Sequence, residues 1–320
     1  MREKKIIAVV GATGQQGGGL VRAIMNDNSG KFKARALTRD PNSDKAHALG
    51  ELGAEVVQVD LQDESSVTRA FEGAHGAYCV TFYFAHMSPE REFADATILA
   101  NAIRNARVEH AIWSTLEDTR KFVPLDDPRM PTIMGKYKVP HFDAKGEADE
   151  LFRKSGVPVT YLLASFYWDN LLAPGRGPTP DANGDLVLNM LMSDRKLAGI
   201  AAEDIGKCAL GIFKRGTELT GQRIGIASDH LTGNEIAEKI SKALGKPVRY
   251  NPVPFAAFRK SGMPLAEEVA NMFQFYVDFE EEVLRSRDIA RSRELDPELQ
   301  SFDEWLARNK SQFAGAASSR

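Results

Sequence analysis

The stretch VVGATGQQGGGL, residues 9–20, decides the fold. It begins within an apolar run, IIAVV at 6–10, that is typical of a buried strand, and it ends in residues with apolar positions at helical spacing. Three evenly spaced glycines, Gly11, Gly14 and Gly17, therefore lie between a predicted strand and a predicted helix. There the first glycine permits a tight turn, the second lets a phosphate approach the backbone, and the third lets the helix pack closely on the strand.

This loop predicts a dinucleotide-binding site. The start of the helix that follows it offers free N–H groups and the positive end of the helix dipole to a pyrophosphate. The alternative is a glycine-rich turn that only reverses the chain. The candidate residues of the loop are Gly11, Ala12, Thr13, Gly14, Gln15, Gln16 and Gly17.

Short apolar runs and helical periodicities alternate through the first 165 residues. This alternation is typical of a parallel sheet with helices on both faces, and it has too few repeats for a barrel of eight units. We therefore predict an α/β fold with a doubly wound parallel sheet. Its further strands are expected at residues 33–37, 55–59, 76–81, 110–114 and 159–163.

The rhythm changes after residue 170, where LLAPGRGPTPDANGD at 171–185 predicts a loop that leaves the sheet. Further on, TGNE at 232–235 predicts a capping box that begins a helix. We expect a first domain at 1–170 that is completed by parts of 196–228. A smaller C-terminal α/β domain is expected from residues 171–195 and 229–320.

The composition argues against some classes of function. The 320 residues carry a formal net charge of -3, so no overall positive field favours nucleic acid or an acidic membrane. The sequence has no recognition-helix signature, and no apolar run reaches the length of a membrane span. The two cysteines, Cys79 and Cys208, lie far apart without metal-ligand spacing, which predicts neither a metal site nor a disulfide. A cytoplasmic protein without nucleic-acid or membrane partners is therefore expected.

The residues after the second and third strands indicate which dinucleotide binds. Thr38 and Arg39 stand where an NAD site usually has a carboxylate, which would repel a 2′-phosphate, whereas a guanidinium binds it. NADP(H) is the predicted cofactor, and a solvated surface arginine is the alternative. Asp60 follows the third strand and is a candidate for the adenine edge of the site, or for a helix cap.

Aromatic residues follow the fourth and sixth strands. Thr81, Phe82 and Tyr83 are predicted to line the cofactor at the carboxyl edge of the sheet, where ligands bind in such folds. A wider aromatic cluster would wall an apolar pocket beside the nicotinamide, or would simply belong to the core. Its members are Phe82, Tyr83, Phe84, Phe166, Tyr167 and Trp168.

Three further candidates concern the chemistry. Short-chain dehydrogenases combine a similar glycine loop with a serine after the fifth strand and a Tyr-x-x-x-Lys pair on the next helix. Ser114 matches the serine, whereas HFDAKGEADELF at 141–152 keeps the lysine as Lys145 but has His141 in place of the tyrosine. Four residues apart, His141 and Lys145 share one helix face. Lys145 is expected to bind ribose hydroxyls and His141 is a candidate general acid; a solvated pair at the helix start is the alternative.

The sequence resembles the NmrA-like proteins, and most closely their HSCARG-like branch, atypical members of the short-chain dehydrogenase superfamily. The resemblance extends from Lys4 to about Phe313 and rests on motifs in a fixed order. These motifs are GATGQQGG (11–18), TRDP (38–41), GAEVVQVD (53–60), HFDAKGEADELFR (141–153), GVPVTYL (156–162), FYWDNLL (166–172) and NMFQFY (271–276).

The resemblance implies a Rossmann NADP(H) domain and a smaller C-terminal domain that closes a cleft. In the family the glycine loop holds the cofactor, here Gly11 to Gln16, and the arginine after the second strand, here Arg39, takes the 2′-phosphate. The family also uses the aspartate and the lysine that correspond to Asp60 and Lys145. The segment that corresponds to Tyr167 to Asn170 crosses the nicotinamide end.

The predicted function follows from the missing tyrosine. NmrA-like proteins are best known as NADP(H) sensors or regulators with little or no dehydrogenase turnover, although some relatives are reductases that use the lysine alone. We favour a sensor of the NADPH/NADP+ ratio, and an NADPH-dependent reductase of a small apolar or aromatic substrate is the alternative. The charged segment 117–138 suggests a mobile lid, a partner surface or a plain solvated loop. The partners considered are a regulatory protein, a small-molecule substrate and a second copy in a homodimer.

Overall fold

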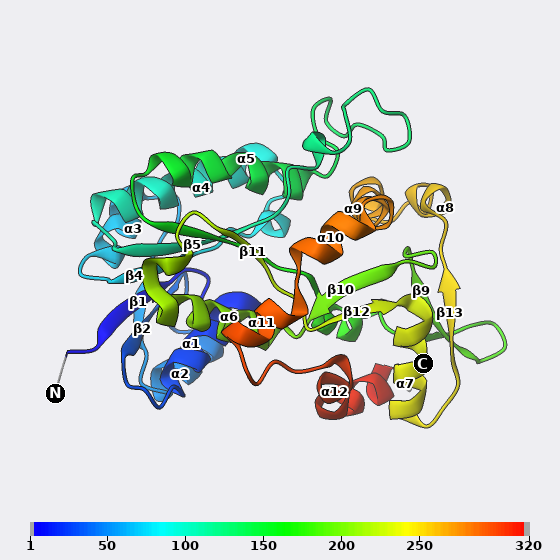
Figure 1. Ribbon diagram of the computed structural model, residues 1–320. Helices are drawn as coiled ribbons and strands as arrows, with labels where there is room; N and C mark the ends of the chain where they lie inside the picture. The colour runs from blue at the N-terminus through cyan, green and yellow to red at the C-terminus, as the bar shows by residue number, and fades with distance from the viewer. Residues whose placement is uncertain (1–2, 317–320) are drawn as a thin grey trace.

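The main layer of the protein is a seven-stranded parallel sheet, seen in a computed structural model that describes residues 3–316 (Figure 1). The strand order is β11-β6-β5-β4-β1-β2-β3, so the direction of winding reverses between β1 and β4. Every pairing in this sheet is parallel, which confirms the predicted doubly wound α/β fold. The strands are β1 (Lys5–Val9), β2 (Phe32–Thr38), β3 (Glu55–Gln58), β4 (Gly76–Cys79), β5 (His110–Thr115), β6 (Val159–Leu163) and β11 (Arg223–Gly225).

Helices cover both faces of this sheet (Figure 1). One face carries α1, α2, α6 and α11, whose apolar side chains join one core cluster. The opposite face carries α3, α4 and α5, whose buried residues form a second cluster with the other side of the strands. The bounds are α1 (Gln15–Met25), α2 (Asp44–Glu51), α3 (Glu64–Phe71), α4 (Pro89–Asn105), α5 (Pro140–Lys154), α6 (Ala202–Arg215) and α11 (Ile289–Leu295).

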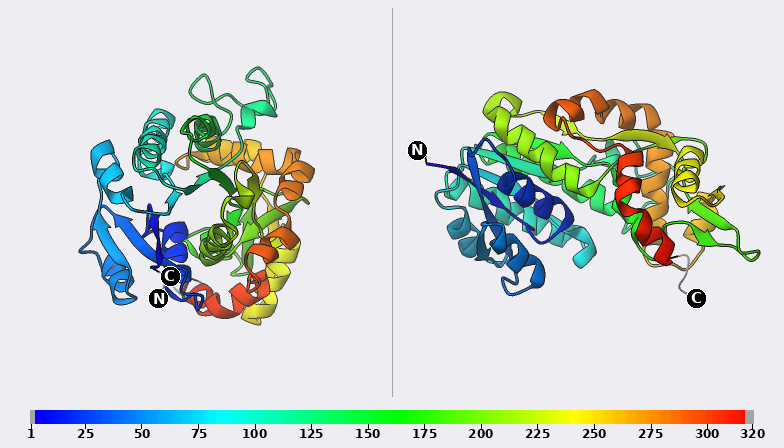
Figure 2. Two further views of the ribbon diagram at one scale, coloured as in Figure 1. Left: turned by 60° about the vertical axis from the view of Figure 1, so that its left-hand side comes forward. Right: turned by 90° about the horizontal axis from the view of Figure 1, so that it is seen from below.

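The glycines behind the loop motif allow α1 to meet α6. A Cβ on Gly19 would lie 2.9 Å from the carbonyl oxygen of Glu203, and one on Gly206 would lie 2.1 Å from the amide nitrogen of Leu20. The two helices therefore touch backbone to backbone, and they lie side by side in the view from below in Figure 2. An ion pair between Arg22 and Glu203 closes the same contact.

The remainder of the chain forms two small sheets and the helices that pack on them, around a third core cluster. The predicted capping box is present at the start of α7, where the Thr232 hydroxyl accepts from the Glu235 N–H. Among residues 3–316, no helix is both long and apolar enough to cross a membrane. The elements are β12 (Asp229–Thr232), β10 (Lys196–Ile200) and β7 (Phe166–Tyr167); β13 (Val248–Pro252), β9 (Leu186–Met190) and β8 (Thr179–Pro180); and α7 (Gly233–Leu244), α8 (Phe255–Arg259), α9 (Ala266–Asp278), α10 (Glu280–Ser286) and α12 (Phe302–Ala316).

The chain passes more than once between these parts. The chain first forms β7, β8, β9 and β10, which belong to the small sheets. It then returns to the main sheet with α6 and β11. The later helices α9 and α10 then contact the small sheets again, before α11 packs beside α6. The predicted domain boundaries stay a prediction.

Segment 117–138, which projects beyond α5 in Figure 1, is anchored by hydrogen bonds. The buried ammonium of Lys138 donates to the carbonyl oxygens of Leu125, Asp127 and Met130 at 3.1, 3.0 and 2.6 Å. From α9, the Asn271 amide donates to the carbonyl oxygens of Pro131 and Lys138 at 2.8 and 2.6 Å. The sequence did not show that NMFQFY supplies this anchor; the lid, the partner surface and the solvated loop stay predictions.

Candidate functional site

The glycine loop has the geometry of a phosphate cradle. Gly11 has a positive φ of 64°, which favours glycine, and Gly14 is the N-cap of α1. A Cβ on Gly17 would lie only 2.4 Å from the carbonyl oxygen of Gly11. Within the described residues, no side chain caps this helix start and its first turn holds no acidic residue. Backbone N–H groups are therefore left for an anionic ligand.

The residue that follows β2 is a cation, Arg39, with no counter-ion among the described residues. Arg39 is exposed, its carbonyl oxygen accepts from the Gln58 amide at 3.3 Å, and none of the ion pairs found within residues 3–316 includes its guanidinium. Thr38 beside it is buried, and its hydroxyl accepts from the Asp40 N–H at 3.3 Å. Arg39 is thus available to an incoming anion.

Asp60 is exposed after β3 and its carboxylate accepts from the Gln62 N–H at 2.9 Å. It is not a helix cap, because Asp63 caps α3 by accepting from the Ser65 N–H at 2.9 Å. Asp60 therefore stands at the end of the sheet with a local turn as its only side-chain contact among the described residues.

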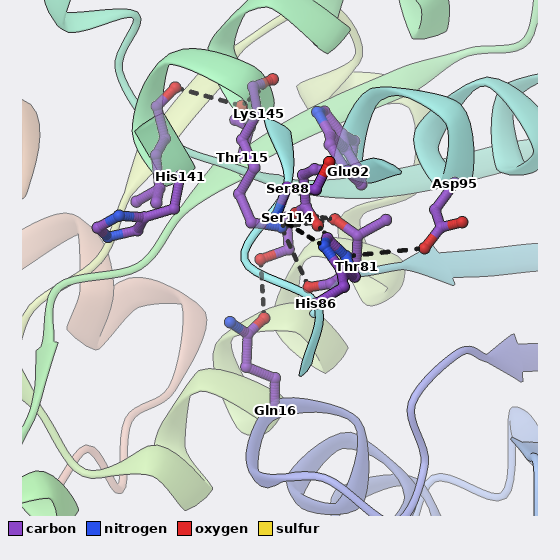
Figure 3. Close-up of polar contacts among 12 residues, drawn as sticks. Gln16, Thr81, His86, Ser88, Glu92, Asp95, Ser114, Thr115, His141 and Lys145 are labelled. Atoms are coloured by element: carbon purple, nitrogen blue, oxygen red, sulfur yellow. Dashed lines mark hydrogen bonds and ion pairs between the residues drawn. The ribbon is translucent and has the colours of Figure 1, made fainter. Parts of the chain in front are cut away.

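Gln16 links the glycine loop to the ends of β4, β5 and β7 (Figure 3). Its amide oxygen accepts from the hydroxyls of Ser114, at 2.8 Å, and Tyr78, and its amide nitrogen donates to the hydroxyl of Tyr167. Burial raises the pKa of Tyr167 to about 12, so this hydroxyl stays protonated near neutral pH. The structure thus brings together loop residue Gln16, the predicted catalytic Ser114 and the predicted cofactor residue Tyr167.

The start of helix α5 is fixed by hydrogen bonds, which orient the face that carries His141 and Lys145. Pro140 occupies the first turn, and the buried carboxylate of Asp143 accepts from the N–H groups of Lys138 and Val139 at 2.8 and 3.1 Å. Burial raises the pKa of Asp143, although its hydrogen bonds oppose that shift. His141 and Lys145 then face the interior of the protein from the same helix, in agreement with their spacing.

Lys145 is held by a buried carboxylate and by Thr81 (Figure 3). Its Nζ lies 2.7 Å from Glu92 Oε1, 2.7 Å from the Thr81 hydroxyl and 3.1 Å from the Thr81 carbonyl oxygen. Glu92 is fully buried in α4. Thr81, predicted to line the cofactor, therefore contacts Lys145 in this structure.

His141 is paired with a second buried carboxylate, Glu268 at the start of α9. Glu268 Oε1 lies 2.5 Å from His141 Nδ1 and accepts from the His141 backbone N–H at 3.0 Å. Its other oxygen accepts from the Tyr83 hydroxyl at 3.3 Å. The remaining ring nitrogen of His141, Nε2, has no hydrogen-bond partner among the described residues and is not shut off from solvent. The alternative that His141 and Lys145 form a solvated pair at the helix start is wrong, since both side chains are largely buried.

The residues of the expected aromatic cluster do not form one group, because some lie in the core and others at the surface. Trp168 is fully buried and its indole N–H donates to the Ser228 hydroxyl at 3.2 Å, so it belongs to the core. Phe82 and Phe84 are 66% and 48% exposed, and the Phe84 ring lies 5.0 Å from that of His141. An aromatic surface therefore adjoins His141. Phe166, Tyr167 and Asn170 are partly buried.

Sequence reasoning missed both carboxylates of the site. Glu92 lies on the buried stripe of α4 with Leu99 and Ile103, and an acidic residue on an apolar stripe was the one local signal. Glu268 lies far along the chain from His141 and gave no local signal. Within residues 3–316, no group of three or more His, Cys, Asp or Glu side chains is arranged to hold a metal ion.

Comparisons with known proteins agree with this architecture. The sequence model of the NmrA-like family matches residues 3–306. The NmrA-like family domain-containing oxidoreductase FrzB of Cladobotryum sp is 28% identical over 291 residues, which span 84% of this chain and 83% of the relative. The crystal structure of NmrA, a negative transcriptional regulator in complex with NADP, has a TM-score of 0.80 at 24% identity and covers 98% of both chains. The NADPH-dependent quinone oxidoreductase of Escherichia coli, complexed with NADPH, has a TM-score of 0.71 at 22% identity and covers 97% of this chain and 99% of that one.

Proposed function

The chain belongs to the NmrA-like family, and from its site we propose that it is an NADPH-dependent reductase of a small apolar or aromatic carbonyl, quinone or nitro compound. The observation that carries this proposal is the pair of His141 and Glu268, because a histidine replaces the tyrosine of short-chain dehydrogenases and has its own buried carboxylate. The names of two similar proteins, an oxidoreductase and an NADPH-dependent quinone oxidoreductase, support the same class. On its motifs we further assign the chain to the HSCARG-like branch.

The residues present fit NADP(H). The cradle of Gly11, Gly14 and Gly17 would hold the pyrophosphate, and Arg39 would take the 2′-phosphate. Ser114, Tyr167 and Lys145 would face the nicotinamide, since ligands bind at the carboxyl edge of such sheets and Ser114 and Tyr167 both contact Gln16 of the loop. When bound, NADPH supplies a hydride.

The proton for such a reduction would come from His141. With Nδ1–H held by the Glu268 carboxylate, the proton transferred would be the one on Nε2 of the doubly protonated ring, and Nε2 would take its replacement from solvent. Phe84, exposed beside the ring of His141, would pack on an apolar or aromatic substrate.

Cofactor choice is tested by Arg39→Ala. Loss of the guanidinium should weaken NADPH binding by about 10- to 100-fold, because one charge-assisted contact to the 2′-phosphate is removed. NADH binding should change less than twofold. Arg104→Ala, at the exposed far end of α4, is the control and should alter neither affinity. Equal affinity for both nucleotides, unchanged in Arg39→Ala, would contradict the role of Arg39; fluorescence titration measures both.

Turnover is tested by His141→Asn. The asparagine amide can replace Nδ1 as donor to Glu268, but it has nothing in place of Nε2. With quinones, aldehydes and nitroaromatics as a substrate panel, kcat should fall about 10²- to 10⁴-fold, while NADPH affinity stays within about threefold. Loss of NADPH absorbance is the readout. Undiminished turnover in His141→Asn would remove His141 from the mechanism.

A redox sensor is the second candidate, favoured by a different observation. Ser114 is engaged by Gln16, and Lys145 by Thr81 and Glu92, so NADP(H) would have to rearrange contacts that join the loop, the sheet edge and α4. The similar NmrA is described as a negative transcriptional regulator. Stoichiometric NADPH binding without turnover of any member of the panel would overturn the reductase and leave the sensor.

A further inference from the structure

The ammonium of Lys145 has no hydrogen left to offer. Three oxygens lie within 3.1 Å of Nζ, two from Thr81 and one from Glu92, and an ammonium carries three N–H donors. The Thr81 hydroxyl in turn donates to the same Glu92 oxygen at 2.5 Å. A ribose hydroxyl can therefore reach Lys145 only if one of these partners leaves.

Of the partners of Lys145, only Glu92 carries a charge, so loss of its contact with Lys145 would change a protonation equilibrium. Burial alone would raise the pKa of this carboxyl, but the charge and hydrogen bond of Lys145 hold it below its ordinary value. Without Lys145, Glu92 would be a fully buried carboxylate with only Thr81 and a histidine nearby. A buried carboxylate that loses its cation tends to take up a proton.

His86 stands on the other side of Glu92 and can share that proton (Figure 3). Its Nε2 lies 3.4 Å from Glu92 Oε2, and neither atom has a hydrogen-bond partner among the described residues. His86 Nδ1 accepts from the Ser88 N–H at 3.2 Å, so the ring hydrogen lies on Nε2, which is near the carboxylate but forms no hydrogen bond with it in this structure. The side chain is 22% exposed, which gives solvent protons a way in.

The other polar groups around His86 do not compete for this role. Asp95 Oδ2 lies 4.0 Å from His86 Nε2, but its second oxygen is paired with Arg91 at 2.7 Å on the same helix. The ring of Tyr83 packs against the imidazole, and burial raises the pKa of its hydroxyl, so Tyr83 stays neutral. Glu92 and His86 are thus the coupled pair that responds to the loss of Lys145.

We propose that Glu92 is the positioning residue of Lys145, that the nucleotide ribose replaces it on the ammonium, and that the Glu92–His86 pair then takes up one proton from solvent. The inference rests on the NADP(H) binding proposed above. It predicts that NADP+ binding is accompanied by proton uptake near pH 7 and weakens as pH rises. The 2′-phosphate would give the opposite sign, because a phosphate bound beside Arg39 releases its proton.

Calorimetry in buffers of different ionisation enthalpy tests this coupling. For the unmodified protein, the heat of NADP+ binding at pH 7 should vary with the buffer in the direction of proton uptake. In Glu92→Gln, where position 92 has no charge to compete for Lys145, the uptake should vanish and NADP+ should bind about tenfold more tightly. Glu90→Gln is the matched control, since Glu90 is exposed on the same helix, and it should behave like the unmodified protein.

The outcomes separate the two proposals. Equal net proton uptake in the unmodified protein and in Glu92→Gln would overturn the role of Glu92 while NADP(H) binding stands. Absence of NADP+ binding would overturn the proposed function and this inference together. If Glu92→Gln does not fold, the affinity of the unmodified protein for NAD+, which lacks the 2′-phosphate, still decides between pH 6 and pH 8, because an NAD+ affinity that does not fall as pH rises contradicts proton uptake.

Discussion

Arg287→Met is expected to lower the free energy of unfolding by about 3–5 kcal/mol. Arg287 lies between α10 and α11 with its side chain fully buried, and its guanidinium forms a two-pronged pair with Glu117, which follows β5 in the chain. It also donates to the carbonyl oxygen of Ala164 at 3.3 Å. Removal of this cation leaves Glu117 as a buried charge without a partner, which costs more than the packing that methionine retains.

Two further variants isolate the cause. Arg287→Met combined with Glu117→Gln should be less destabilised than Arg287→Met alone, because the unpaired charge is gone. Arg153→Met removes an exposed ion pair with Glu150 and should change the free energy of unfolding far less than Arg287→Met does. Urea denaturation measures all three. If Arg287→Met costs no more than Arg153→Met, the buried pair does not hold these elements together.

The same pair gives stability a defined pH dependence. Burial opposes ionisation of Glu117, but Arg287 more than compensates and holds the pKa of this carboxyl below its ordinary value near 4.5. The unfolded chain therefore binds the proton first as pH falls. The contribution of the pair is complete above pH 4.5 and is lost as pH falls through the depressed pKa in the folded protein.

The main sheet could be predicted from the sequence because each strand is a short apolar run between turn signals. β1, β2, β3, β5 and β6 lie at the predicted places, and β4 ends at Cys79, two residues before the predicted end at Thr81. β11 was missed, because three residues, RIG, carry no readable periodicity and the strand is defined by its pairing with β6. The strands β7 and β8 were missed for the same reason, because each has only two residues.

The candidate site was predictable only where its chemistry is local. The glycine loop, Arg39 and the spacing of His141 and Lys145 are properties of single segments. Glu268 reaches His141 across 127 positions of sequence, and Glu92 reaches Lys145 from another helix. Such partners are chosen by the packing of α4, α5 and α9, which the order of residues in any one segment does not express.

Gly17→Ala is expected to weaken NADP(H) binding by more than about tenfold and to destabilise the protein by about 1–3 kcal/mol. The added methyl group would lie 2.4 Å from the carbonyl oxygen of Gly11 and 2.8 Å from that of Val10, and both are backbone atoms that cannot turn aside. Relief of this overlap must move the start of α1 away from the loop. The backbone N–H groups that face a pyrophosphate would move with it.

Gly50→Ala is the control that separates this cause from the loss of a glycine as such. Gly50 lies in α2, where a Cβ would meet only the Val56 side chain at an ordinary 3.7 Å. Alanine favours helix over glycine by about 1 kcal/mol, so this variant should be at least as stable as the unmodified protein and should bind NADPH equally well. Equal NADPH affinity in Gly17→Ala would mean that the close approach of α1 to its own loop serves packing alone, and that the cofactor does not depend on it.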